Sequence, residues 1–158
     1  MVRVFDIEIA YGLIAIFAAS LENPFNDWSA EHIAQGFSWR PGSVSFRTLI
    51  DAGAHSVELT LVEHFSTPSS DAIRVIEVPF DAPADGAIEV GGVMETVPFS
   101  LAAGSYMLRC EFYLPVESVW RVRLVFSFGD KSHFRILRAD SEITITDGFL
   151  TTAQPAVN

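Results

Sequence analysis

Four histidines and one cysteine are the side chains of this 158-residue chain best suited to metal binding or nucleophilic catalysis. The histidines are His32, His55, His64 and His133, and no two of them show a metal-binding spacing such as His-x-x-x-His. A catalytic cysteine needs a lowered pKa and a nearby base, and nothing in the sequence around Cys110 points to either. We therefore expect no metal site, and a buried, unreactive Cys110.

Other catalytic motifs are equally hard to find. Gly91-Gly92 has neither the spacing nor the following helix of a phosphate-binding loop. The serine at position 105 lacks the flanking glycine pattern of a nucleophile elbow. With 20 acidic residues in the chain, a pair of catalytic carboxylates for glycoside hydrolysis stays open as an alternative. We predict that the protein is not an enzyme and uses no cofactor.

Charge narrows the choice of partner. The formal net charge of −10 opposes direct binding to nucleic acid and suits solubility or a basic protein partner. Residues 71–95 carry one base and six acids, namely Asp71, Glu77, Asp81, Asp85, Glu89 and Glu95. Bases concentrate instead in residues 109–138, so we expect an acidic face and a smaller basic one. The alternative is that the acidic run is a solvated strand edge and turn, where charge blocks edge pairing.

The sequence contains segments in which apolar and polar residues alternate with period two, which indicates β-strands. Residues 106–114 alternate Leu108, Cys110 and Phe112 with polar positions, and residues 120–128 place Trp120, Phe126 and Phe128 on one side. Such strands have one buried face and one wetter face, as in an antiparallel sheet. Further strands are expected at residues 2–10, 13–18, 44–50, 56–65, 73–80, 88–90, 95–101, 132–138 and 142–146.

About ten short strands at close spacing predict an all-β fold, an antiparallel β-sandwich or open barrel. We expect one domain over residues 1–150 and a flexible C-terminal tail over residues 151–158.

Residues 27–36 break the strand pattern and predict one short helix. Asp27 or Ser29 can accept hydrogen bonds from its first free backbone N–H groups, and Gly36 suits a left-handed C-terminal cap. A helix of this length needs tertiary packing, which we expect Trp28 and Ile33 to provide. Trp28 and Trp39, on either side of the helix, could alternatively form the aromatic surface of a small-ligand or carbohydrate-binding module.

Several segments resemble the competence protein J family. They are the helix segment Asp-Trp-Ser-Ala-Glu-His-Ile-Ala-Gln-Gly-Phe at residues 27–37, the strand at 42–46, Val78-Pro79-Phe80, and residues 99–110. Their order and approximate spacing match over residues 5–115. Known members include the inhibitor of the bacterial DNA-entry nuclease, so the resemblance implies a related fold and a non-enzymatic inhibitor. It supplies no motif that marks the inhibitory contacts.

Combining charge with this resemblance, we expect a protein partner, a basic nuclease, with no direct nucleic-acid binding and no membrane association. The candidate contact residues are Asp27, Trp28, Glu31, Trp39, Asp81, Asp85 and Glu89. One unpaired cysteine fits a reducing compartment, and the apolar run at residues 9–21 is too short to span a bilayer. We therefore expect a cytoplasmic protein, whose oligomeric state the sequence leaves open.

Overall fold

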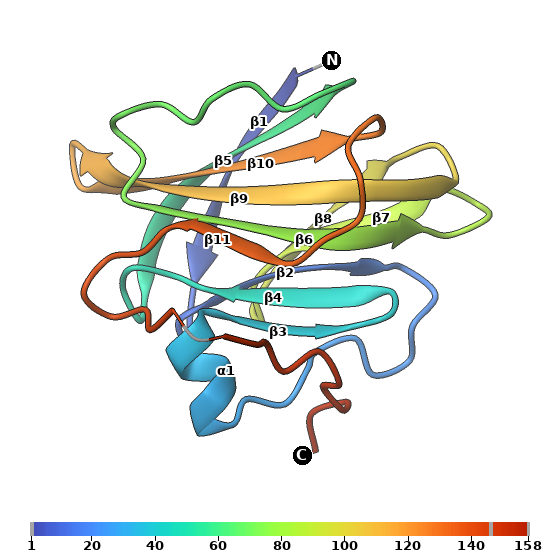
Figure 1. Ribbon diagram of the computed structural model, residues 1–158, viewed down its shortest axis with the longest axis horizontal. Coiled ribbons are helices and arrows are strands. Elements are labelled where there is room, and N and C mark those ends of the chain that lie inside the picture. The colour runs from blue at the N-terminus through green and yellow to red at the C-terminus, as the bar shows by residue number, and fades with distance from the viewer. Residues whose placement is uncertain (1, 146, 158) are drawn as a thin grey trace.

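The protein is a β-sandwich of two packed sheets, seen here in a computed structural model that describes residues 2–145 and 147–157 (Figure 1). These residues form eleven strands and one helix. The first sheet has the order β1-β5-β10-β9-β6-β11 and the second has the order β3-β4-β2-β7-β8. The bounds are β1 Val2–Ile9, β2 Leu13–Ala18, α1 Ala30–Gln35, β3 Phe37–Arg40, β4 Ser43–Arg47, β5 Gly53–Val62, β6 Arg74–Ala82, β7 Ala87–Gly91, β8 Thr96–Ser100, β9 Gly104–Val116, β10 Val119–Ser127 and β11 Arg135–Arg138.

Alternating side chains from both sheets fill the space between them. Leu108, Cys110 and Phe112 of β9 point into this core, as their period predicts, and are almost fully buried. Burial raises the pKa of the Cys110 thiol well above its usual range. All described strand pairs are antiparallel except β5 with β10. The predicted antiparallel sandwich is therefore confirmed, and the sheets do not close into a barrel.

Two strand predictions were wrong. The four-residue strand β3 follows directly after the helix and was missed, because its short segment has little room for a periodic pattern. Residues 142–145 form no strand, and Thr146 lies outside the described residues. Phe128 was assigned to the core, but β10 ends at Ser127 and the Phe128 side chain is 57% exposed.

The helix α1 is shorter than predicted, because its N-cap is Ser29. The Ser29 hydroxyl accepts a hydrogen bond from the His32 backbone N–H, while His32 Nδ1 accepts one from the Ser29 N–H. Gly36 caps the other end with φ of 85°, as expected. Ile33 does not dock the helix, since it is 45% exposed; His32 and Gln35 are the buried helix residues.

The outer face of the six-stranded sheet is drier than alternation predicts. Arg109 and Glu111 of β9 are buried there together with Glu77 of β6. The segment before β6 covers them, because the Ser66 carbonyl accepts a hydrogen bond from Arg109 and the Phe65 ring lies 4.2 Å from its guanidinium carbon. Loops that are distant in the sequence therefore cover a face that was predicted to be exposed to solvent, and its charged side chains are buried. Arg109, one of the bases expected to form a basic face, is therefore buried in ion pairs instead.

The end of the chain packs against the sandwich. Phe134, just before β11, stacks on Phe37 and contacts Trp39 edge-on. Ala153 is buried, and its backbone N–H donates to the Trp39 carbonyl oxygen at 3.0 Å. Asp27 accepts a hydrogen bond from the Gln154 backbone N–H at 3.0 Å. A flexible tail from residue 151 stays a prediction about mobility, whereas the contacts of residues 153–156 connect it to the body.

Candidate functional site

One end of the sandwich carries a hollow beside α1, which we call the α1 pocket. Its volume is about 250 Å³, and it is lined by Tyr11, Gly12, Leu13, Trp28, Ile33, Arg47 and Asp51. These residues come from the connection between β1 and β2, from α1 and its N-terminal flank, and from β4 and the loop after it. The three elements meet at the lower left of Figure 1. The pocket combines an apolar floor with an exposed rim.

The floor of the α1 pocket rests on the outer side of β2. Leu13, Ala15 and Phe17 form a small buried cluster there, and Trp28 packs against it. The Trp28 ring also meets the His32 ring edge-on, with centroids 6.2 Å apart. Burial lowers the pKa of His32, although the nearby carboxylates of Asp27 and Glu31 oppose that shift. The neutral, buried imidazole therefore supports the wall of the pocket.

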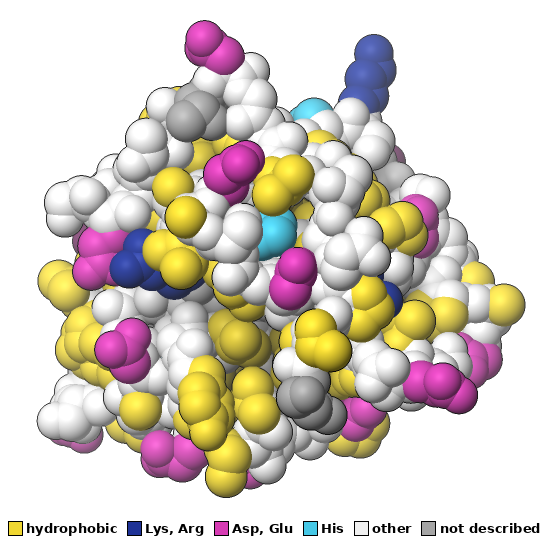
Figure 2. Space-filling view, turned by 90° about the horizontal axis from the view of Figure 1, so that it is seen from below, with side chains coloured by type: hydrophobic (Ala, Val, Ile, Leu, Met, Phe, Trp, Pro, Cys, Tyr) yellow, Lys and Arg dark blue, Asp and Glu magenta, His cyan; other side chains and the backbone are white. Residues whose placement is uncertain are grey.

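The rim of the α1 pocket is apolar and acidic. Tyr11 is 76% exposed and Ile33 is 45% exposed, and both line the pocket. Asp51 and, on the other side of α1, Glu31 are exposed carboxylates for which the described residues offer no ion pair. Arg47 is the basic side chain of the lining, and Glu142 neutralises it at 3.1 Å. Figure 2, which shows this end from below, has acidic side chains scattered among hydrophobic ones.

Only some of the predicted partner-contact residues lie at the α1 end of the sandwich. Trp28 and Glu31 lie there, but Asp27 is engaged by the C-terminal segment. Trp39 is largely a packing residue, since its Nε1–H donates to the Pro79 carbonyl oxygen at 2.7 Å and its ring contacts Phe134. The two tryptophans therefore do not share an exposed aromatic surface.

The predicted acidic run is distributed over several surfaces. Asp81 and Asp85 are exposed near the turn between β6 and β7, far from α1 in Figure 1. Asp85 caps that turn by accepting a hydrogen bond from the Ala87 N–H at 3.0 Å. Glu89 is half-buried on β7 and accepts a hydrogen bond from Thr96 at 2.9 Å. Their role in partner binding stays a prediction, but they do not form one patch with α1.

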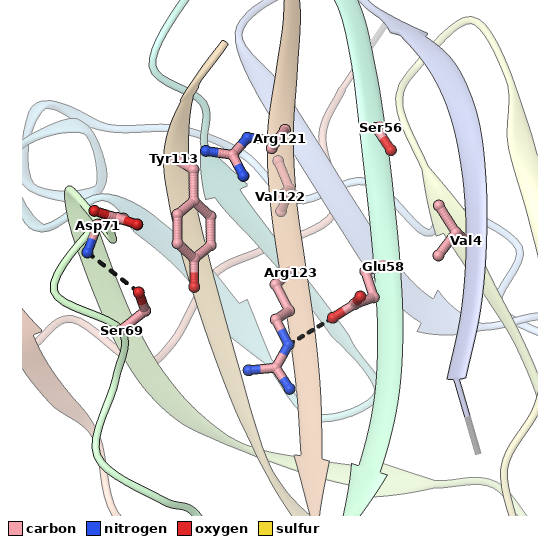
Figure 3. A pocket seen from close by; sticks show the side chains of 9 residues that line it. All are labelled: Val4, Ser56, Glu58, Ser69, Asp71, Tyr113, Arg121, Val122 and Arg123. Carbon is pink, nitrogen blue, oxygen red and sulfur yellow. Dashed lines mark hydrogen bonds and ion pairs between the residues drawn. The ribbon is translucent and has the colours of Figure 1, made fainter. Parts of the chain in front are cut away.

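A second hollow, of about 320 Å³, lies on the outer face of the six-stranded sheet (Figure 3). Arg123 lines it and is neutralised by Glu58 at 2.6 Å and by Glu111 at 3.4 Å. Tyr113 donates a hydrogen bond to Glu111 at 2.8 Å, and burial followed by that bond raises the pKa of Tyr113 to about 12. Arg121 lies over the Tyr113 ring. Arg123, Glu58, Glu111 and Tyr113 satisfy one another in this hollow. Arg121 and Asp71 also line it, are exposed and form no ion pair within the described residues, so the hollow presents charges of both signs rather than an acidic surface.

The described residues contain no group of three side chains able to hold a metal ion. Within the same residues, no helix has the length and apolar character needed to cross a membrane.

The sequence of this chain matches the profile of a known protein family. The sequence profile of competence protein J (ComJ) matches residues 6–129. The chain belongs to the competence protein J family. The match confirms the resemblance read from residues 5–115 and extends it through β10. No curated protein shows a significant sequence match to this chain.

Two solved structures share the fold of this family member. The crystal structure of ComJ from Bacillus subtilis, described as an inhibitor of the DNA degrading activity of NucA, has a TM-score of 0.60 and 22% sequence identity. The similarity covers 80% of this chain and 98% of that chain. A protein described as crocagin biosynthetic gene J has a TM-score of 0.52 and 14% identity, covering 79% of this chain and 97% of that chain.

Tyr11 and Asp51 are the functional candidates that sequence reasoning missed. Both lie in connections, which carry no periodic signal. Tyr11-Gly12 lies between the strands predicted at residues 2–10 and 13–18, but that position does not by itself indicate an exposed ring. Tyr11 falls within the matched region of the competence protein J family, as does Asp51.

Proposed function

We propose that this protein is a non-enzymatic inhibitor of a nuclease, and that it binds the nuclease through the α1 end. Membership of the competence protein J family supports the inhibitory role, since the similar structure from Bacillus subtilis is described as an inhibitor of NucA. The observation that carries the choice of surface is the Asp51 carboxylate, which lines the α1 pocket with the exposed Tyr11 and Ile33 and has no ion pair among the described residues. Glu31, on the other side of α1, adds a second exposed carboxylate to this end.

The chemistry of the partner follows from its substrate. DNA is a polyanion, so a nuclease that binds it presents basic side chains along its cleft. A protein of net charge −10 is attracted to such a cleft, and carboxylates can occupy the positions that phosphates would otherwise take. Burying Tyr11 and Ile33 in the same contact adds the apolar area that charge alone does not supply. We therefore expect a basic nuclease.

The α1 end is preferred over the turn that holds Asp81 and Asp85. Asp85 already accepts a hydrogen bond from its own turn, which partly accounts for its presence there. The α1 end offers a pocket, exposed apolar side chains and acids together, which is the composition of a specific protein interface. The single cysteine suits a reducing compartment, so we place the complex in the cytoplasm.

The test is an inhibition titration of DNA degradation. The nucleases are NucA from Bacillus subtilis and any nuclease encoded beside this chain, each assayed at low and at high salt. Inhibition of one of them, weakened by salt, is the expected result, because exposed charges are screened at high ionic strength. If the wild-type chain inhibits none at a tenfold molar excess, the proposed function is wrong.

A matched pair of variants locates the surface. Glu31→Gln/Asp51→Asn should weaken inhibition at low salt and flatten its salt dependence, because both carboxylates face the partner. Asp81→Asn/Asp85→Asn removes the same charge from the other end and should leave inhibition nearly unchanged. The reverse ranking of the two double variants would show that the partner binds the turn between β6 and β7.

A further inference from the structure

Tyr11 has a backbone conformation that its residue type disfavours. Its φ is 62°, followed by 65° at Gly12, where the chain passes from the six-stranded to the five-stranded sheet. Bulky side chains rarely adopt the left-handed region, which glycine and asparagine tolerate far better. The other non-glycine residues with positive φ are Glu117 and Ser118, at the tip of the β9–β10 hairpin. That conformation is standard for a two-residue hairpin turn.

The Tyr11 side chain adds little to the stability of the fold that could offset this backbone strain. It is 76% exposed, and the described residues give its hydroxyl no hydrogen-bond partner. Strained residues persist where the surrounding structure fixes them, and they cluster at binding and active sites. Tyrosine is also among the residue types that dominate binding energy at protein interfaces.

Hydrogen bonds of Gly12 fix the backbone of the turn that carries Tyr11. The Gly12 N–H donates to the Asp51 carbonyl oxygen at 2.8 Å, and the Thr48 N–H donates to the Gly12 carbonyl oxygen at 2.9 Å. A side chain at Gly12 would lie 3.4 Å from the Asp51 carboxylate, so this acid sits directly against the turn. Tyr11 and Asp51 line the same pocket on this fixed turn, so the backbone that presents them loses little conformational freedom on binding.

We infer that the α1 pocket receives an arginine or lysine side chain of the nuclease, held between the Tyr11 ring and the Asp51 carboxylate. The inference rests on the proposed function and names the contact within it. An aromatic face attracts a cation, and a carboxylate beside it adds an ion pair. Arg47 lines the same pocket, but Glu142 neutralises its charge, so the pocket stays favourable for a cation.

Four substitutions at exposed positions test this contact with the nuclease that the wild-type chain inhibits. Tyr11→Phe keeps the ring and should inhibit within about threefold of the wild type. Tyr11→Leu keeps apolar area without an aromatic face, and Tyr11→Asn removes both; each should weaken inhibition about tenfold or more. Met94→Asn is the matched control, since Met94 is equally exposed but lies outside the α1 pocket, and it should inhibit like the wild type.

Melting temperature separates binding from folding. Tyr11→Asn should melt at or above the wild-type temperature, because asparagine tolerates positive φ, while its inhibition falls. Full inhibition by Tyr11→Asn would overturn the contact and leave the proposed function intact. A parallel loss of stability and inhibition would overturn it too, by showing a structural role. Equal inhibition by Tyr11→Leu and Tyr11→Phe would exclude the cation contact. A wild-type chain that inhibits no nuclease would refute the function itself.

Discussion

Glu77, Arg109 and Glu111 form a charged layer buried under the outer loops. Neutralising Glu77 tests whether this layer is shielded from water. Arg109 Nε donates to Glu77 Oε2 at 2.8 Å, and His133 Nε2 lies 2.7 Å from the other carboxylate oxygen. The Glu77 side chain is only 3% exposed. In Glu77→Gln the amide keeps the shape of the side chain and still offers one acceptor oxygen to Arg109, but it carries no charge. Arg109 would then keep only Glu111, at 3.6 Å, as a charged partner.

The loss of folding free energy expected for Glu77→Gln follows from the burial of the ion pair. Removing one partner of a buried ion pair costs about 3–5 kcal/mol, because the remaining charge stays out of water. The amide oxygen of glutamine still accepts one hydrogen bond, so we take the lower end, about 3 kcal/mol. For a chain of this length, each kcal/mol shifts the melting temperature by about 2–4 °C, which gives a fall of about 6–12 °C.

The control is the same substitution at an ion pair of similar geometry. Arg123 Nε donates to Glu58 at 2.6 Å, but the Glu58 side chain is 37% exposed, so Glu58→Gln should cost no more than about 1 kcal/mol. Urea unfolding at constant slope measures both variants. If Glu77→Gln costs no more than Glu58→Gln, water reaches the layer and the reasoning from burial is wrong.

Three further outcomes follow from the core, the helix cap and the sheet face. Cys110 should react with a thiol reagent only on unfolding, because burial raises its pKa; rapid labelling of the folded protein would contradict this. Gly36→Val should lower the melting temperature more than Gly148→Val, since Gly36 has a positive φ and its Cβ would lie 2.7 Å from Ile143, whereas Gly148 has no such φ and a Cβ there meets no atom of the described residues within 4 Å. Because folding raises the pKa of Tyr113 to about 12, its contribution to stability is present below about pH 10 and lost as pH rises towards 12. Melting temperatures of Tyr113→Phe should therefore depend less on pH in that window, and an unchanged slope would argue against the shift.

Local periodicity predicted the strands but not what covers them. The alternation in β9 correctly places Cys110 and Phe112 in the core. It also predicts that Arg109 and Glu111 meet water, and here it fails. The residues that cover Arg109 are far away in the sequence, namely Phe65 and Ser66. Period-two patterns describe two faces of a strand, whereas burial of the outer face depends on loop contacts that no local pattern encodes.

The candidate site was predictable only where it lies on a regular element. Trp28 and Glu31 were found because the capping signals of α1 mark their segment. Tyr11 and Asp51 come from two separate connections, and they meet because β1 leaves one sheet and β2 enters the other beside the loop after β4. Neither residue carries a signal for that meeting, since it is set by sheet topology.

The charged layer and the Tyr11 turn are both places where the chain departs from local preference, but they differ in what compensates the departure. Each buried charge of the layer has a partner within the chain, so its cost is met by folding itself, and its presence says little about function. Backbone hydrogen bonds of Gly12 hold the strained turn at Tyr11, but the exposed Tyr11 side chain has no hydrogen-bond partner among the described residues. Strained residues cluster at binding sites, and the exposed Tyr11 ring has no role within the described part of the chain that would explain its choice. For that reason the exposed turn, rather than the larger buried network, is where the contact with a nuclease is to be sought.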